Sequence, residues 1–410
     1  MEKERFYGWW IVVFCFTIFL TILGFNATLP MYFVPISEGL GVATSRVSII
    51  QITMGISVLT MNIIYSFLVN KIGIKRLLVL GVIFVGSGYI IMSQSSSITL
   101  VYAGAAFIGC GYAFTTTIPI TAIVSNWFLE KRGMILGIIF AASGIGGMIL
   151  SPIVGNLITS YGYQTSFLVQ AVIILSAGVP AAVLIKTDPK LVNQSPYGKA
   201  MEESNDTKSL LTVKEVMSSY AYWFTAIGVL IIAISVQMVM YSVPTYLDHS
   251  GISLQRVSFL WAIMFGLNAG FKVLLGRLSD RFGVWTVIGI NLTCLVVVSI
   301  SLMVLPVSTV QYIFPLVLAL AMVFLTVPIP LLVQRMFGGE VYTQIIGIII
   351  SALSIGMSFA PFVGSKIQEG FGYTSVYGMS VVLSLLGVVL LTISNRKICK
   401  MKESKRKNVA

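Results

Sequence analysis

Long apolar runs alternate with short polar segments along the 410-residue chain. Each run is roughly 20 residues long, the length that a helix needs to cross the hydrocarbon core of a bilayer. The pattern predicts twelve transmembrane helices, at residues 7–29, 46–69, 76–93, 98–126, 134–159, 165–185, 221–247, 256–277, 285–305, 309–333, 343–367 and 374–394. The first run is too long for the apolar region of a cleavable signal peptide. The expected fold class is therefore an all-α membrane protein with twelve transmembrane helices.

Composition excludes a water-soluble fold, because 57% of the residues are hydrophobic and only 10% are charged. A formal charge of +12 is compatible with nucleic-acid binding in a soluble protein, but here the cations are distributed differently. With the N-terminus in the cytoplasm, 22 Lys and Arg residues fall on the cytoplasmic side and three, Arg46, Arg256 and Lys366, on the other. This asymmetry predicts a multi-pass protein of the cytoplasmic membrane with both termini cytoplasmic. The expected surroundings are the lipid bilayer, and no nucleic acid partner is expected.

Lys272 is the remaining cation, and it falls well within the eighth predicted span. All 14 carboxylates lie in loops, tails or span ends, so no other charged residue shares this position. An ionisable residue inside a span tends to face a polar cavity and to mark a substrate path, because exposing it to lipid is costly. The alternative is that Lys272, five residues before Arg277, extends to the cytoplasmic headgroups.

A polar segment, residues 186–219, separates the first six predicted spans from the last six. The two halves resemble each other at a nearly constant offset: Gly73 of LVNKIG and Gly283 of LSDRFG are 210 residues apart, and Pro119 and Pro328 are 209 apart. The sequence therefore predicts four parts, which are an N-terminal six-helix half (1–185), a cytoplasmic linker (186–219), a C-terminal six-helix half (220–395) and a basic cytoplasmic tail (396–410).

No segment has the pattern of a cofactor or metal site. The glycine cluster at 143–147 lies within an apolar helix and lacks the lysine of a phosphate-binding loop. The one histidine, His249, falls in a predicted outer loop without a set of neighbouring ligands. We therefore expect no cofactor and no metal. Enzyme activity is not expected either, because no nucleophile is paired with a base.

Four motifs resemble those of a known family. GRLSDRFG after the eighth span, and its weaker copy SFLVNKIG after the second, are similar to the cytoplasmic motif of the major facilitator superfamily. FYGWWIVV near the N-terminus and NWFLEKRGMILGI at 126–138 resemble signatures of its monocarboxylate and oxalate/formate branch. The resemblance covers about residues 6–395. It implies two pseudo-symmetric six-helix halves that rock about a substrate site near the midplane.

The resemblance assigns gating roles to loop residues. These are Gly276, Asp280, Arg281 and Gly283 after the eighth span, Asn70, Lys71 and Gly73 after the second, and Lys131 and Arg132 in the 126–138 signature. A carboxylate in such a motif can interact with a helix N-terminus and nearby arginines and hold the inward gate closed. Only Asp280 provides this carboxylate, because the N-terminal copy has Asn70 instead, and Ser66 where glycine is usual.

The resemblance also implies that Lys272 binds the substrate. Related carriers place a substrate-binding arginine four residues before the motif glycine, whereas lysine is a point charge without the two-point grip of arginine. Asn268, one turn earlier on the same helix face, is similar in position to a proton-binding aspartate of animal carriers. Its alternative role is a helix-packing contact. The second cation of oxalate carriers matches Leu353 here, which favours a monoanion.

Five polar residues on other spans are candidates to complete the substrate cavity, and each has a structural contact as its alternative role. They are Asn26, Tyr32, Thr117, Gln237 and Tyr241.

The predicted function is secondary active transport of a small organic monocarboxylate by a monomer. Proton coupling through Lys272 and exchange against a counter-anion both remain open. One alternative is export of amphipathic drugs or secondary metabolites, which the apolar composition and the 18 methionines favour. Another is a membrane sensor that binds without transport, which has less support because no loop is long enough for a signalling domain.

Overall fold

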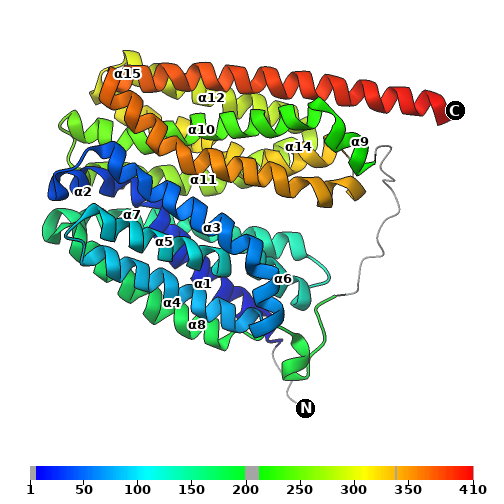
Figure 1. The fold of residues 1–410 in the computed structure, drawn as a ribbon, viewed down its shortest axis with the longest axis horizontal. Helices are drawn as coiled ribbons and strands as arrows, with labels where there is room; N and C mark the ends of the chain where they lie inside the picture. Colours follow the sequence, from blue (N-terminus) through cyan, green and yellow to red (C-terminus); the bar gives the residue numbers. More distant parts are fainter. Residues whose placement is uncertain (1–5, 199–211, 338, 410) are drawn as a thin grey trace. The chain divides into compact units, whose positions relative to one another are not determined.

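The computed structural model describes residues 6–198, 212–337 and 339–409, nearly all of which are helical (Figure 1). The elements, with 3-10 and π segments written η, are α1 (Gly8–Ala27), η1 (Leu29–Tyr32), α2 (Phe33–Leu40), α3 (Thr44–Ile72), α4 (Ile74–Ser93), α5 (Ile98–Thr115), α6 (Thr117–Trp127), α7 (Arg132–Ile173), η2 (Ile174–Gly178), α8 (Val179–Leu184), η3 (Pro189–Val192), α9 (Val213–Ser218), α10 (Tyr220–His249), α11 (Leu254–Phe282), α12 (Val284–Val304), α13 (Val307–Met322), η4 (Val323–Leu325), α14 (Pro328–Phe337) and α15 (Gly339–Val409). Within the described ranges, β-pairing is confined to a single bridge between Phe128 and Tyr197.

Ten helices in the described part of the chain are long and apolar enough to cross a membrane. Two of them are much longer than one crossing, at 53 residues for Arg132–Leu184 and 61 for Ile345–Lys405. Gly162 (φ 81°, ψ 163°) interrupts the first, and Gly372 (φ 78°, ψ 174°) interrupts the second. Only glycine adopts these angles readily, so each glycine divides its helix into two crossings. The ten helices are consistent with the twelve predicted crossings, and the predicted all-α membrane fold is confirmed.

The fourth and tenth crossings are not continuous helices. The fourth breaks between α5 and α6 at Thr116, whose backbone leaves the helical region (φ −101°, ψ −132°). The tenth passes from α13 through η4 and Thr326 (φ −128°, ψ −49°) before α14 begins at Pro328. A proline lies just after each break, Pro119 in the first case and Pro328 in the second, and a proline near the start of a helix costs no hydrogen bond.

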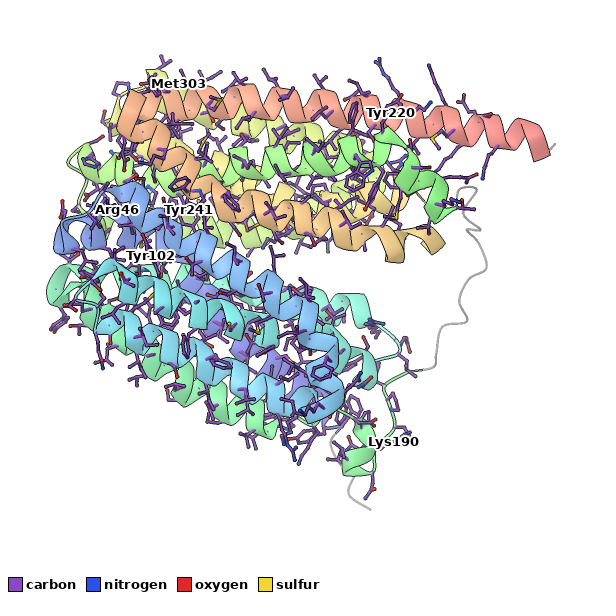
Figure 2. The ribbon with its side chains drawn as sticks, viewed as in Figure 1. Arg46, Tyr102, Lys190, Tyr220, Tyr241 and Met303 are labelled. Carbon is purple, nitrogen blue, oxygen red and sulfur yellow. The ribbon has the colours of Figure 1, made fainter. Side chains whose placement is uncertain are left out.

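The described helices form two compact units. One contains residues up to 202 together with 253–266. In this unit α1 packs on α7, α5 packs on α3 and α4, and the Tyr102 hydroxyl donates to the Arg46 carbonyl at 2.6 Å (Figure 2). The first turns of α11 also belong to it, since the Trp261 indole donates to the Ala27 carbonyl at 3.1 Å.

The second unit contains residues 203–252 and 267–410. Here α10 packs along α15, and α12 packs on α13 and α15. A buried hydroxyl pair joins α10 to α15, with the Ser235 and Ser380 oxygens 2.8 Å apart. At one end of α10 the Lys397 ammonium lies 5.4 Å from the centre of the Tyr220 ring, which Figure 2 labels. The predicted tail at 396–410 continues α15 as a helix as far as Val409. The predicted four-part division of the chain stays a prediction.

The start of the predicted linker is fixed to the loop that follows α6. The Asn126 amide donates to the Thr187 carbonyl at 3.0 Å, and the Trp127 indole donates to the Lys186 carbonyl at 2.7 Å. The Tyr197 backbone N–H then donates to the Trp127 carbonyl at 2.8 Å. The asparagine and tryptophan that open the 126–138 signature therefore hold the linker against the first unit.

Candidate functional site

Lys272 lies in the second half of α11, ten residues before its end, in the second unit, and is half-buried. Two ion pairs form among the described side chains, Lys366–Glu369 and Lys405–Glu215, and neither includes it. No described residue offers Lys272 a hydrogen bond. Its neighbours Phe271 and Leu275 pack against Val323 of η4, so this part of α11 lies against the break in the tenth crossing. The result is a cation without a protein counter-ion among the described groups, on a helix that contacts irregular backbone.

Asn268, one turn before Lys272, is only 3% exposed. Its amide nitrogen donates to the carbonyl of Ala319 in α13 at 2.8 Å. This bond uses one amide hydrogen of the predicted substrate ligand to hold two helices together, which is the packing role considered as its alternative.

Gln237 and Tyr241 lie one turn apart on α10, in the same unit, and both are buried. The Gln237 side-chain oxygen finds no hydrogen-bond partner among the described atoms. Amide oxygens left unpaired inside a protein are uncommon. This oxygen is therefore suited to accept a hydrogen bond from a ligand.

The other predicted substrate residues belong to the first unit. Asn26, in α1, is half-buried, and its buried side-chain oxygen has no described partner. Tyr32, in η1, is enclosed: its hydroxyl lies 2.6 Å from that of Ser166, accepts from the Gln170 amide, and its ring stacks on Phe167. Thr117 is exposed and begins α6 directly after the break at Thr116.

Three of the predicted gating residues lie in the motif at the end of α11, in the second unit. Asp280, Arg281 and Gly283 line a polar cavity of about 510 Å³ together with Arg335 of α14. The Arg281 guanidinium lies 5.2 Å from the centre of the Phe282 ring. Asp280 forms no ion pair with any described side chain. Gly276 lies one turn earlier in α11 and has open space around it.

The N-terminal gating residues lie at matching places in the first unit. Asn70 and Lys71 are exposed at the end of α3, and Gly73 (φ 84°) connects α3 to α4 as Gly283 (φ 88°) connects α11 to α12. Lys131 has a left-handed backbone (φ 58°) and precedes α7, which Arg132 begins.

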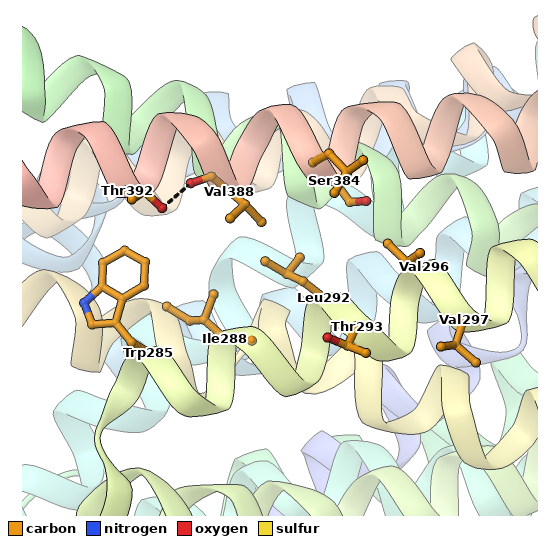
Figure 3. Close-up of a pocket in the computed structure, with 11 residues that line it drawn as sticks. Trp285, Ile288, Leu292, Thr293, Val296, Val297, Ser384, Val388 and Thr392 are labelled. Atoms are coloured by element: carbon orange, nitrogen blue, oxygen red, sulfur yellow. Dashed lines mark hydrogen bonds between the residues drawn. The ribbon is translucent and has the colours of Figure 1, made fainter.

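A second cavity of the second unit, a groove of about 460 Å³ between α12 and α15, does not suit a small anion (Figure 3). Trp285, Ile288, Leu292 and Val296 line one wall, and Ser384 and Val388 contribute to the other. No cation lines it, and none of the predicted substrate residues reaches it. Among the described residues, no three His, Cys, Asp or Glu side chains lie close enough to hold a metal ion.

Two residues of this region were not found from the sequence. Asn291 of α12 is fully buried, and its amide donates to the Leu320 carbonyl at 2.6 Å, next to the carbonyl bound by Asn268. Arg335 lines the polar cavity with the motif residues. The signal for Asn291 was an amide in the middle of an apolar span, since polar side chains there need partners on neighbouring helices.

The fold and the repeated motif define a class of membrane proteins built from two related six-helix halves. The chain matches the model of the Major Facilitator Superfamily over residues 14–361 and belongs to this superfamily.

The curated relatives are named as transporters rather than enzymes. Monocarboxylate transporter 12 of Mus musculus is 23% identical over 300 residues, 67% of this chain and 61% of that protein. Monocarboxylate transporter 2 of Rattus norvegicus is 28% identical over 221 residues, 52% of this chain and 45% of that protein. The match thus spans about half to three fifths of the relatives' length. A solved bacterial homolog of the human lysosomal transporter Spinster has the same fold, with a TM-score of 0.70, 13% identity and 99% coverage of both chains.

Proposed function

We propose that this protein is a secondary transporter of a small organic monocarboxylate, and that Lys272 is the charge that binds the carboxylate. The observation that carries the proposal is the half-buried position of Lys272 in α11 with no counter-ion among the described side chains. A charge within a membrane span is costly when unpaired. A carboxylate substrate would supply the missing partner each time it enters.

The chemistry of the predicted substrate residues favours a small monoanion. One cation balances one carboxylate, and the position of a second cation in oxalate carriers is held here by Leu353, which is buried. In the unit that carries Lys272, the buried Gln237 amide presents an unpaired oxygen that suits a hydroxyl or amine on the substrate. The names of the relatives, monocarboxylate transporters, point to the same substrate class.

The further parts of the proposal follow from the sequence. The cation asymmetry favours the cytoplasmic membrane with both termini cytoplasmic. The protein works as a monomer by alternating access, driven either by a proton that Lys272 carries or by exchange against a second anion. Asp280, Arg281, Arg335 and their N-terminal counterparts would act at the cytoplasmic gate.

Uptake into reconstituted vesicles tests the proposal. Radiolabelled lactate, pyruvate, formate, acetate and oxalate would each be offered with a pH gradient, with an internal counter-anion, and with neither. We expect uptake of at least one monocarboxylate, and weaker uptake of oxalate. Stimulation by the pH gradient alone would assign proton coupling, and stimulation by internal anion alone would assign exchange. Absence of uptake for every acid, with efflux of an amphipathic cation or neutral dye, would favour the exporter alternative.

A further inference from the structure

Two asparagine side chains from different helices hold consecutive backbone carbonyls at the end of α13. Asn268 of α11 donates to Ala319 at 2.8 Å, and Asn291 of α12 donates to Leu320 at 2.6 Å. Both asparagines are almost completely buried, at 3% and 0% exposure. We call this pair of bonds the asparagine clasp.

The clasp lies where the backbone of α13 stops being an α-helix. The Val323 N–H bonds to the carbonyls of Leu320 and Ala321 instead of reaching the Ala319 carbonyl, as the chain tightens into η4. An α-helical N–H would bond to the carbonyl four residues earlier, so the tightening removes that partner from Ala319. A carbonyl without a donor in the hydrocarbon region costs several kcal/mol. The Asn268 amide supplies the missing donor, and Asn291 adds a second donor to the Leu320 carbonyl, which the Val323 N–H already bonds.

The same break packs against the part of α11 that carries Lys272. Leu275 and Phe271 contact a cluster that contains Val323, Leu320 and Val327. Asn268 and Lys272 are one turn apart on one rigid helix, so they project from neighbouring positions of its surface. The position of Lys272 relative to the tenth crossing is thus set by two kinds of contact, one apolar and one hydrogen-bonded.

The clasp leaves one buried group unsatisfied. The Asn291 side-chain oxygen has no partner among the described atoms, although the residue is fully buried. A buried acceptor without a partner is uncommon and unfavourable, so an arrangement of the surrounding helices that brought a donor to it would be stabilised. The unsatisfied oxygen therefore favours a second state of the break over a permanently fixed one.

We propose that the asparagine clasp positions Lys272 against the break in the tenth crossing and couples anion binding at Lys272 to bending of that crossing. The proposal rests on the proposed function of Lys272. Asn268 and Asn291 act as positioning residues: they touch the backbone of α13, and their effect reaches the substrate through α11. When an anion draws Lys272 toward it, Asn268 moves with the same helix and the bond to Ala319 changes.

The test uses a reporter on α14, the helix beyond the break. Gln334 is exposed there, and Gln334→Cys in a background with the four native cysteines replaced would be labelled by an impermeant maleimide from the cytoplasmic side. Labelling rates would be measured in vesicles without acid and with saturating lactate, pyruvate or acetate. Transport of the same acid would be recorded as turnover and KM for each variant.

We expect Asn268→Ala and Asn291→Ala to raise the labelling rate without acid by about fivefold, the equivalent of one buried hydrogen bond of roughly 1 kcal/mol. Both should abolish the change caused by the acid and lower turnover more than they change KM. Asn291→Ser, which keeps a donor, should recover part of the wild-type behaviour. Gln311→Leu is the matched control, because the Gln311 amide donates within its own helix to Ser308 at 3.0 Å and its loss should leave the labelling unchanged.

Different results would contradict the clasp and the proposed function of Lys272. Wild-type labelling in both alanine variants would overturn the clasp, whatever Lys272→Gln does. Faster labelling with unchanged turnover and an unchanged response to the acid would overturn the coupling. Lys272→Gln should keep the basal labelling rate and lose only the response. Transport by Lys272→Gln at the wild-type rate would overturn the proposed function and with it the coupling, even if the alanine variants loosen the break.

Discussion

The fourth and tenth crossings break at equivalent places in the repeat, but they are held there in different ways. Thr116 and Thr326, the two break residues, are 210 residues apart, and the prolines that follow them are 209 apart, the two offsets that relate the halves. In the second unit, Asn268 and Asn291 bind the carbonyls of Ala319 and Leu320. In the first unit, glycines occupy two of the matching positions. The repeat thus keeps the break in the backbone while the side chains that stabilise it have diverged.

In the first unit, the helices beside the break are held by close packing at glycines. Gly81, 210 residues before Asn291, packs so tightly on α5 that a Cβ atom would lie 2.6 Å from Thr115 Cγ2 and 2.7 Å from Phe114 Cβ. Gly109, 210 residues before Ala319, would meet Ser57 Cβ at 2.7 Å as well as the Met54 carbonyl. Contacts of this kind are lost steeply with distance. A glycine contact therefore favours one separation of the helices.

In the second unit, the break is held by asparagine hydrogen bonds, which can be exchanged. An amide can leave one carbonyl and find another acceptor, and the net value of each bond is only about 1 kcal/mol. The half with the exchangeable bonds is also the half that carries Lys272. If the proposed role of Lys272 is correct, we expect the first unit to provide a fixed support and the second to provide the part that responds to substrate.

The largest effect is expected from disturbing the glycine contact. Gly109→Leu places a side chain where the backbone of α3 already lies, and overpacking of this kind typically costs about 1–3 kcal/mol or more. We expect a strong fall in monodisperse yield and in melting temperature, measured by size-exclusion chromatography and thermal scanning in detergent. Gly289→Leu is the control, because Gly289 has no neighbour within 4 Å. Equal stability of the two variants would show that the tight packing of α3 on α5 is not needed.

The next effect concerns the charge in the second unit. Lys272→Gln removes the cation and keeps a similar length, so monocarboxylate uptake should fall at least tenfold, which corresponds to about 1.4 kcal/mol. Lys272→Arg should retain uptake, since its two-point geometry suits a carboxylate. Lys366→Gln is the control, because that exposed cation pairs with Glu369 at 3.2 Å outside the proposed site. If Lys272 only reaches the headgroups, all three variants will transport alike.

A smaller effect is expected at the two related motifs that end α3 and α11. Asp280→Asn makes the second copy resemble the first, which already has Asn70. We expect turnover to fall several-fold while equilibrium affinity stays nearly unchanged, because Asp280 lies two turns beyond Lys272 on α11. Exchange and binding measured on the same vesicles separate the two quantities. Asn70→Asp is the reciprocal change. A large loss of affinity in Asp280→Asn would place that carboxylate at the substrate instead of the gate.

The smallest effect is expected at the contact between α9 and the end of α15. A hydrogen bond from Lys405, with smaller contributions from Thr212, holds the pKa of Glu215 at about 2 instead of its ordinary 4.5. A carboxylate whose pKa is lowered by a contact stabilises that contact at pH values above its ordinary pKa. This stabilisation is lost as the pH falls through the lowered pKa. A spin label at Ser404→Cys should therefore stay equally mobile from neutral pH to about pH 5, and loosen only on further acidification. Glu215→Gln should loosen the label at neutral pH and leave transport unchanged, since exposed ion pairs contribute little. An equally mobile label in both proteins would show that the pair does not hold the tail.

The crossings could be predicted from the sequence because the bilayer imposes a length and a composition on each of them. The breaks could not, although Pro119 and Pro328 were recognised as a matching pair. Hydropathy is insensitive to a backbone that changes direction inside an apolar segment. Both breaks are marked by a threonine, Thr116 and Thr326, and threonine is common in regular transmembrane helices too.

For the candidate site, the sequence located Lys272 on its span but not its surroundings. The partners of Asn268 and Asn291 are backbone carbonyls 51 and 29 residues away. A carbonyl is present at every residue, so no pattern of side chains indicates which one is free to accept. The roles of Asn126 and Trp127 were likewise hidden, because a signature motif does not show that its side chains hold the linker.

The single-residue connections at Gly162 and Gly372 have a consequence for how the protein enters the membrane. Each joins two long apolar helices through one non-helical residue, and the polar residues beside it, such as Gln164 and Glu369, are themselves in helical turns. With so short a connection, we expect the two helices of each pair to enter the membrane together as a hairpin. Replacement of either glycine by a β-branched residue would then reduce the amount of protein that is inserted during synthesis, before transport is ever affected.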